Sequence, residues 1–361
     1  MSAYTPLQEQ NFIGTAGGKP TRLITLRNSR GMIVRFTTLG AKILQIVVPD
    51  RNGAMDDVAL GYENIAQVIG GQSSMGAFVG RYANRIAHGE FTLDSVRCRI
   101  KPNSGKHVLH GGEHGSRTRV FEVLDLEPSC ARLGLHYASA EDGFPGNLMS
   151  RVIYRVTEDN ELAIEYDAAC DSPTVVNMTS HVFFNLAGER RISAQSLLDH
   201  RLSINAGAWT PVDSGQIPTG EIRSVAGTPL DFRQPRAVGA HIDAAARDLE
   251  PHSGYDHNWV LDKPYRQFGL AATLSEPVSG RVMEVHTTEP ALVFYSGNNL
   301  NGSAPRDIGK GGVAYEARSA LCLEPAHFPD SPNHPEFPST VLRPGQWFSG
   351  KTVYRFLTSP A

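Results

Sequence analysis

Short apolar runs separated by Gly and Pro recur along the whole chain and constrain its fold more than any other feature. Several of them alternate apolar and polar residues with period two, as in Leu162-Ala163-Ile164-Glu165-Tyr166. Short runs of this kind, bounded by turn residues, predict β-strands. The clearest runs are residues 33–37, 43–48, 150–156, 162–166, 291–295 and 351–356. Turn signals at residues 50–53 and 158–160 predict two hairpins.

Strand patterns spread over the full length, without alternating long helices, predict an all-β sandwich or barrel. The chain has no Ser/Gly linker, low-complexity tract or block of charge that marks a boundary, so residues 1–361 are expected to form a single β domain. Residues 217–235 and 325–338 are long, Pro-rich connections. Ordered loops on a β scaffold are where functional sites usually lie.

Composition excludes several classes of function. The net charge is -3 and Lys and Arg are scattered, so neither nucleic acid nor a membrane is an expected partner. No apolar run approaches the roughly 20 residues of a spanning helix. The polar N-terminus MSAYTPLQEQNF lacks the apolar segment of a secretory signal, and the four cysteines form no CxxC pair. Reduced thiols and a cytoplasmic location are therefore expected.

Two polar segments in the first third of the chain are candidates for a site. Asn84 and Arg85 lie in GRYANRIAHG, and amides and guanidinium groups suit sugar hydroxyls. The alternative is a surface turn with solvated arginines. The second segment, HVLHGG, holds His107 and His110. Metal binding, a single His110 facing a pocket, and a purely structural histidine remain alternatives for this segment.

Three later residues are candidates for acid/base chemistry. His181 is flanked by hydroxyl and amide side chains on one side and aromatic ones on the other, so it is a candidate general acid or base, or a structural core histidine. Asp256, in SGYDHNW, is a candidate for accepting sugar hydroxyls, or else begins a turn. Glu324 is predicted to end an apolar strand before Pro325, where apolar neighbours make it a candidate for a raised pKa, or else it is a salt-bridged glutamate at the strand end.

In this order, the segments resemble those of the aldose 1-epimerase (galactose mutarotase) family. The matching blocks are GRYANRIAHGEF, LHGG, the His181 segment ending in FFNLAG, GYDHNW, FYSGNNL and LCLEPAHFPDSPNHPEFPS. The resemblance implies a large antiparallel β-supersandwich of the galactose mutarotase-like type, with an open cleft for a monosaccharide. It also implies interconversion of the α and β anomers of free aldoses without metal or cofactor, by a monomer or homodimer.

The resemblance also implies roles for individual residues. His181 matches the general acid and Glu324 the general base. Asn84, Arg85, His110 and Asp256 match residues that bind the sugar. Phe183 and Val293 depart from the family pattern, which often has Tyr and Gln there. Because a site that bonds a hydroxyl discriminates strongly, these two apolar residues predict a shifted or broader substrate range than galactose and glucose.

Ring opening requires a base at the anomeric O1 hydroxyl and an acid at ring O5. With ordinary pKa values of about 4.3 and 6.5, an ionised Glu324 and a protonated His181 are expected between about pH 6 and 8. Their mutual attraction is expected to raise the pKa of His181. Alternatives are a sugar-phosphate epimerase using Arg81, a non-catalytic sugar-binding protein, and a glycosidase with Asp256 and Glu324 as its two carboxylates.

Overall fold

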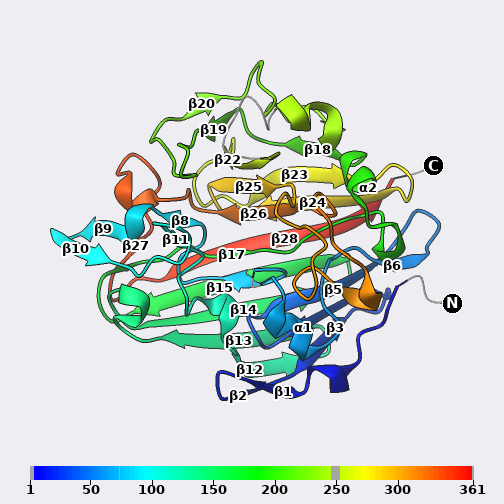
Figure 1. The fold of residues 1–361 in the computed structure, drawn as a ribbon, viewed down its shortest axis with the longest axis horizontal. Coiled ribbons are helices and arrows are strands. Elements are labelled where there is room, and N and C mark those ends of the chain that lie inside the picture. The colour runs from blue at the N-terminus through cyan, green and yellow to red at the C-terminus, as the bar shows by residue number, and fades with distance from the viewer. Residues whose placement is uncertain (1–3, 73, 245–252, 360–361) are drawn as a thin grey trace.

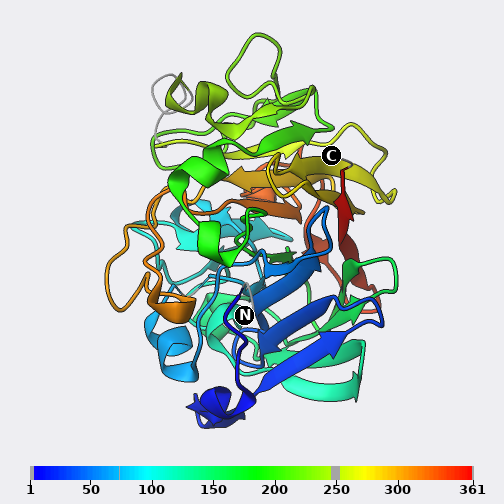
Figure 2. The same ribbon diagram turned by 90° about the vertical axis from the view of Figure 1, so that its right-hand side faces the viewer.

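The largest sheet has nine antiparallel strands and forms the back of the molecule (Figures 1 and 2). A computed structural model describes residues 4–72, 74–244 and 253–359. In spatial order the nine strands are β12 (Glu122–Glu127), β13 (Cys130–Tyr137), β14 (Leu148–Val156), β15 (Glu161–Cys170), β28 (Phe348–Thr358), β24 (Arg281–Thr287), β23 (Gly269–Ser275), β18 (Arg201–Ile204) and β21 (Arg236–Ala237). Alternate residues of β14 point into the core, as the period-two pattern predicts.

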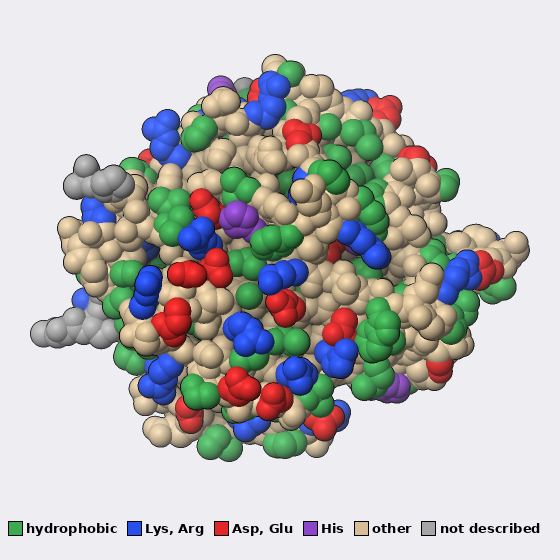
Figure 3. Space-filling view, turned by 180° about the vertical axis from the view of Figure 1, so that it is seen from behind, with side chains coloured by type: hydrophobic (Ala, Val, Ile, Leu, Met, Phe, Trp, Pro, Cys, Tyr) green, Lys and Arg blue, Asp and Glu red, His purple; other side chains and the backbone are tan. Residues whose placement is uncertain are grey.

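The outer face of this sheet is solvated. Seen from behind, Lys and Arg side chains lie beside Asp and Glu side chains over much of the surface (Figure 3). Cross-strand ion pairs include Arg151 with Asp167 at 2.8 Å and Lys351 with Glu165 at 2.9 Å. Exposed pairs of this kind contribute only about 0–1 kcal/mol each to stability. The stability of the sheet therefore depends mainly on its buried face.

A four-stranded antiparallel sheet packs on part of the inner face. Its strands are, in order, β3 (Leu23–Arg27), β4 (Ile33–Thr37), β5 (Lys42–Pro49) and β6 (Met55–Asp57). The ring of Phe36 meets that of Tyr154 edge-on, with centroids 4.9 Å apart, and the Tyr154 hydroxyl donates to the Ala41 carbonyl at 2.8 Å. These contacts join the four-stranded sheet to β14 of the large sheet.

A five-stranded antiparallel sheet covers another part of the inner face. Its strands are, in order, β20 (Arg223–Ser224), β19 (Ala208–Thr210), β22 (Asp256–Val260), β25 (Ala291–Tyr295) and β26 (Cys322–Ala326). The Tyr354 hydroxyl of β28 donates to the Leu323 carbonyl of β26 at 2.9 Å. β26 is the last strand of this sheet, and its Pro325 carbonyl accepts a hydrogen bond at 2.8 Å from Thr179 Oγ1, two residues before His181.

Short elements complete the described fold. Two-stranded pairs are β1 (Gly14–Ala16) with β2 (Lys19–Thr21), β9 (Glu90–Leu93) with β10 (Val96–Arg99), β8 (Arg85–Ile86) with β11 (Val108–Leu109), β7 (Phe78–Val79) with β17 (Thr179–Ser180), and β16 (Thr174–Val175) with β27 (Val341–Leu342). The helices α1 (Ile65–Gly70) and α2 (Ala194–Leu198) are short and are capped by Asn64 and Ser193. Within the described ranges, no helix combines the length and apolar character that crossing a membrane requires.

The prediction of an antiparallel all-β fold is confirmed. Each of the six predicted strand runs lies within β4, β5, β14, β15, β25 or β28, and the two turn signals join β5 to β6 and β14 to β15. One continuous hydrophobic cluster extends in sequence from Ile24 to Phe356 and includes residues of all three large sheets. The assignment of residues 1–361 to a single domain stays a prediction.

Candidate active site

The eight side chains that the sequence predicted for the site line one cavity of about 180 Å³. They come from segments far apart in the chain, and Glu324 of β26 is one of them. The eight are Asn84, Arg85, His110, His181, Phe183, Asp256, Val293 and Glu324. The cavity is smaller than the 300–1,000 Å³ typical of sites for drug-sized ligands, which suits a single sugar ring.

Two rows of the five-stranded sheet contribute Asp256, Val293, Tyr295 and Glu324 to one wall of the cavity. In the first row Asn258 lies opposite Val293, which lies opposite Glu324; in the second row Asp256, Tyr295 and Cys322 are aligned in the same way. Residues two apart on a strand share a face, so the six side chains point to the same side of the sheet. Strand register therefore places Asp256 and Glu324 on the same face of the sheet, two strands apart.

Glu324 lies in the middle of β26, so the prediction that it ends a strand is wrong by two residues. The strand continues through Pro325 to Ala326, with Pro325 opposite Leu292 of β25. Proline cannot donate to a ladder, and it is tolerated here because β26 is an edge strand of its sheet. The Glu324 side chain is only 6% exposed, because the strand places it in the cavity wall.

His181 directly follows β17 and is held by its backbone from both directions. Its N–H donates to the Ala77 carbonyl and its carbonyl accepts from the Gly76 N–H, both at 2.9 Å. The imidazole stacks on Phe183, with ring centroids 5.1 Å apart. Its Nε2 lies 3.6 Å from Glu324 Oε1. This separation is longer than a hydrogen bond, so the two groups face each other without being locked together.

Burial shifts the pKa values of both groups toward their neutral forms. It lowers the pKa of His181 to about 4 and raises the pKa of Glu324 well above its ordinary range. The Asp256 carboxylate adds to the rise in the Glu324 pKa, and the Arg117 guanidinium adds to the fall in the His181 pKa. The expectation that Glu324 raises the pKa of His181 is therefore wrong, because removing both charges from water costs more than their attraction at 3.6 Å returns.

His110 is oriented by a backbone contact. Its Nδ1 accepts from the Asn84 N–H at 3.2 Å, and its own N–H donates to the Asn84 carbonyl at 3.0 Å. Burial lowers the pKa of His110 well below its ordinary value, and the neighbouring His181 acts in the same direction. A neutral ring that accepts at Nδ1 carries its proton on Nε2. His110 can therefore donate a hydrogen bond to a sugar oxygen without competing for the reacting proton.

Arg85 and Asp256 supply opposite charges to the same part of the cavity. Arg85 begins β8, and its N–H donates to Asn84 Oδ1 at 2.8 Å. Burial lowers the pKa of Arg85, and attraction to Asp256 opposes that shift. A guanidinium donates and a carboxylate accepts, so the two together can bind neighbouring hydroxyls of one sugar.

Phe183 and Val293 form apolar parts of the wall, each about 5% exposed. Val293 lies directly opposite Glu324, and Phe183 stacks on His181. Both apolar side chains therefore adjoin His181 and Glu324, where they lower the polarity of the surroundings.

Seven further residues line the cavity and were not predicted. They are Gln72, Ser74, Met75, Leu109, Tyr295, Asn299 and Leu300. Tyr295 is two residues from Val293 on β25, so the period-two rule could have identified it. Tyr295 and Asn299 also lie in or beside the FYSGNNL block. No sequence signal marks Gln72 or Ser74, which reach the cavity from the connection before β7.

Arg81 does not reach the cavity. Its side chain is buried and Nη2 donates to the carbonyls of Pro145 and Gly146 and to Thr174 Oγ1, each at 3.0 Å. The Arg81 side chain therefore binds backbone and hydroxyl groups inside the protein. The suggestion that it binds the phosphate of a sugar phosphate is wrong.

Metal binding was an alternative for the segment that contains His107 and His110. The two imidazole rings accept hydrogen bonds from different backbone groups. Nδ1 of His107 accepts from the His88 N–H at 3.0 Å, whereas Nδ1 of His110 accepts from Asn84. Among the described residues, candidate ligand atoms of His181, Cys322 and Glu324 lie within 4.8 Å of one another. Cys322 Sγ meets Nδ1 of His181 at 3.4 Å, while Glu324 faces Nε2. One metal ion takes one ring nitrogen, so this arrangement suits proton transfer better.

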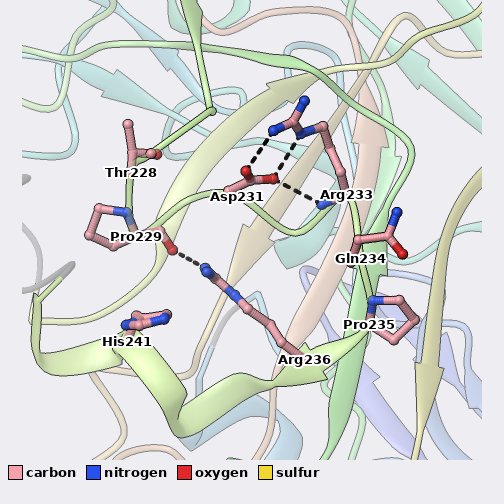
Figure 4. A pocket seen from close by; sticks show the side chains of 9 residues that line it. Thr228, Pro229, Asp231, Arg233, Gln234, Pro235, Arg236 and His241 are labelled. Atoms are coloured by element: carbon pink, nitrogen blue, oxygen red, sulfur yellow. Dashed lines mark hydrogen bonds and ion pairs between the residues drawn. The ribbon is translucent and has the colours of Figure 1, made fainter.

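A larger cavity of about 890 Å³ lies away from these residues, between segments of residues 227–241 (Figure 4). Its charged groups already bind one another or the backbone. Asp231 and Arg233 form a paired contact at 2.7 Å, and Arg236 donates to the Pro229 carbonyl. The smaller cavity is the better candidate because it gathers groups with shifted pKa values around one space.

Comparison with known proteins agrees with this geometry. A family model described as Aldose 1-epimerase matches residues 22–355. An aldose 1-epimerase of Escherichia coli (strain K12) is 38% identical over 342 residues, which is 94% of this chain and 96% of the relative. A galactose mutarotase of Bos taurus is 38% identical over 328 residues, 90% of each chain. The crystal structure of a GalM/aldose epimerase homologue from C. elegans is 30% identical, has a TM-score of 0.85, and covers 94% of this chain and 99% of its own.

Proposed function

The chain belongs to the aldose 1-epimerase family, and we propose that His181 and Glu324 are the acid/base pair of its reaction. The enzyme interconverts the α and β anomers of a monosaccharide. The observation that carries the proposal is the placement of the two groups: they face each other at 3.6 Å across one end of the sugar-sized cavity.

The reaction needs one proton removed from the anomeric O1 and one delivered to ring O5. Glu324, as a carboxylate, takes the O1 proton, and protonated His181 gives its proton to O5 from Nε2. The C1–O5 bond breaks, and C1=O1 forms as the aldehyde. Rotation about C1–C2 and the reverse transfers close the ring as the other anomer. Each positioned proton-transfer group typically contributes about 10²–10⁴-fold to the rate.

The pair carries one proton throughout this cycle. In the empty cavity burial favours that proton on Glu324, with His181 neutral. The same neutral form is left after ring opening. With a cyclic sugar bound, O1–H donates to the Glu324 carboxylate and Nε2–H of His181 donates to O5, and hydrogen bonds to the charged forms favour them. The proton therefore moves between the two groups, and turnover does not require its exchange with solvent.

Asn84, Arg85, His110 and Asp256 hold the sugar in this scheme. Arg85 and Asp256 bind hydroxyls, and His110 donates from Nε2 near the reacting end, since its ring lies edge-on to that of His181 at 5.3 Å. Holding O1 and O5 at the pair converts a slow encounter into a reaction within one complex.

The apolar Phe183 and Val293 support a substrate range that is not centred on galactose. Neither side chain can bond a sugar hydroxyl, so a sugar that lacks a hydroxyl at their position loses nothing there. We expect the ratio of kcat/KM values between D-galactose, D-fucose and L-arabinose, which differ only in the substituent on C5, to be within about tenfold.

Polarimetry tests both proposals. Fresh α-D-glucose, α-D-galactose, D-fucose and L-arabinose are followed with the wild-type enzyme, with Glu324→Gln and with His181→Ala. We expect each variant to lose about 10²–10⁴-fold in kcat while its thermal melting is retained. Glu122→Gln and His136→Ala are matched controls, since both side chains are exposed on the large sheet. Near-full activity of Glu324→Gln would falsify the assignment of the base.

A further inference from the structure

Arg85 lines two adjoining spaces. One is the sugar cavity, and the other is a small pouch of about 20 Å³ that shares Asn84, Asp256 and Val293 with it. Gln216 lines the pouch from the connection between β19 and β20, a segment that no sequence motif singled out. The guanidinium of Arg85 therefore lies at the boundary between the substrate and a part of the protein outside the predicted site.

The segment that carries Gln216 is a tight, well-bonded turn. Asp213 Oδ1 accepts from the N–H groups of Gly215 at 2.7 Å and Ile217 at 3.0 Å. The Asp213 N–H donates to the Ile217 carbonyl at 2.8 Å, and the Gln216 N–H donates to the Asp213 carbonyl at 2.9 Å. Gln216 itself has a left-handed φ of 63°. The turn thus presents the glutamine side chain from a fixed backbone.

Gln216 contacts the guanidinium directly. Its Oε1 accepts a hydrogen bond from Arg85 Nη2. The backbone of Arg85 is fixed as well, because its N–H donates to Asn84 Oδ1 and its carbonyl accepts from the Asp330 N–H at 2.9 Å. Between these two fixed ends the arginine stem has several rotatable bonds, so an acceptor at the fork selects one orientation out of many.

We propose that Gln216 is a positioning residue that holds the Arg85 guanidinium in the orientation that binds sugar hydroxyls. The inference rests on the proposed role of Arg85 in substrate binding. Gln216 is not among the residues that line the sugar cavity, and it acts through Arg85. Without its acceptor, Arg85 must be ordered by the substrate at the moment of binding, and that cost weakens binding without touching the acid/base pair.

Two substitutions at one position test this. Gln216→Asn shortens the side chain by one methylene, so the amide retracts from Arg85, while asparagine tolerates the left-handed backbone. Gln216→Glu keeps the length and the acceptor oxygen. Ser214→Ala, at an exposed position of the same turn, is the matched control. Initial rates of mutarotation over a range of sugar concentration give kcat and KM separately, and thermal melting checks the fold.

We expect Gln216→Asn to raise KM about tenfold, since a hydrogen bond to a charged group contributes about 1.5 kcal/mol or more and 1.4 kcal/mol is a factor of ten. Its kcat should stay within about twofold, and Gln216→Glu should restore KM to within about twofold. A KM for Gln216→Asn within twofold of wild type, a loss confined to kcat, or a Gln216→Glu variant as impaired as Gln216→Asn overturns the inference. A wild-type enzyme without mutarotase activity would instead overturn the proposed function.

Discussion

Two buried pairs of oppositely charged residue types lie in contrasting surroundings. Lys310 and Asp57 are both 0% exposed, and Lys310 Nζ donates to Asp57 and to the carbonyls of Leu44 and Ala59, the latter two at 2.7 Å. Asp57 also accepts from Gln45 Nε2 at 3.0 Å and from a backbone N–H at the same distance. In this pair the protein itself supplies the hydrogen bonds that both charges need.

The pair of His181 and Glu324 has fewer hydrogen bonds from the protein. The two groups are 3.6 Å apart, and the side-chain partner of the imidazole on its other side is the weakly hydrogen-bonding thiol of Cys322 at 3.4 Å. Both groups face a cavity, and burial shifts the pKa values of both toward neutrality. A fully bonded pair holds the connection around residue 310 to β5 and β6, whereas a pair short of partners leaves room for a substrate to supply them.

The largest effect that this comparison predicts is on stability. Lys310→Met leaves the buried Asp57 carboxylate without its cation and is expected to lower the free energy of unfolding by about 3–5 kcal/mol. Glu324→Gln, by contrast, should leave stability within about 1 kcal/mol, because it replaces a group that burial already keeps neutral. Urea unfolding monitored by tryptophan fluorescence measures both.

Lys351→Met is the control for that experiment, because it removes an exposed cation that pairs with Glu165 at 2.9 Å. Its cost should stay below about 1 kcal/mol. If Lys310→Met unfolded at the same urea concentration as wild type, the pair would not be the structural element that its hydrogen bonds indicate.

The second prediction concerns the pH dependence of kcat/KM, which reports groups in the free enzyme. The active pair carries one proton. It gains a second proton when His181 is protonated, at a pKa of about 4, and it loses its proton only above the ordinary carboxyl range, because the Glu324 pKa is raised. We therefore expect an acidic limb near pH 4 that belongs to the pair as a whole, followed by a plateau that extends above the ordinary carboxyl range.

Rates measured between pH 3.5 and 10 in buffers of constant ionic strength give the profile. An acidic limb centred between pH 6 and 7 would mean that His181 keeps its ordinary pKa in the empty cavity. The Lys310–Asp57 and His181–Glu324 pairs would then differ only in their hydrogen-bond geometry.

The smallest effect is expected at Cys322, which is fully buried behind the imidazole. Burial raises the pKa of this thiol well above its ordinary value, so it meets His181 as a neutral group. Cys322→Val fills similar space without a hydrogen-bonding group and should lower kcat about fivefold, which corresponds to about 1 kcal/mol of hydrogen bonding. Cys322→Ser keeps a group that can hydrogen-bond to Nδ1 of His181 and should lower kcat less.

Both variants are assayed by polarimetry after their melting temperatures are compared with wild type. A loss of kcat above about 10³-fold in Cys322→Val would show that the imidazole depends on its neighbour as strongly as Lys310 depends on its several acceptors. The His181–Glu324 pair would then also depend on hydrogen bonds that the protein supplies.

Much of this site could be predicted from the sequence because it rests on local patterns. The six strand runs follow from short apolar segments bounded by turn residues, several of them with period-two alternation, and the ordered blocks around Asn84, His110, His181, Asp256 and Glu324 pointed to one family. The eight predicted side chains do line one cavity. Gln216 was missed because its turn carries no motif, and its contact with Arg85 joins residues 131 positions apart.

The sequence by itself thus determined the fold class and the family, and it predicted His181 and Glu324 as the acid/base pair. Only the tertiary structure decided where their proton rests. The pKa of Glu324 depends on how much water the surrounding strands exclude and on the register that places Asp256 on the same face of the sheet. Both are sums over side chains from many separate segments. Local pattern therefore predicted which groups react, and packing determined their charge.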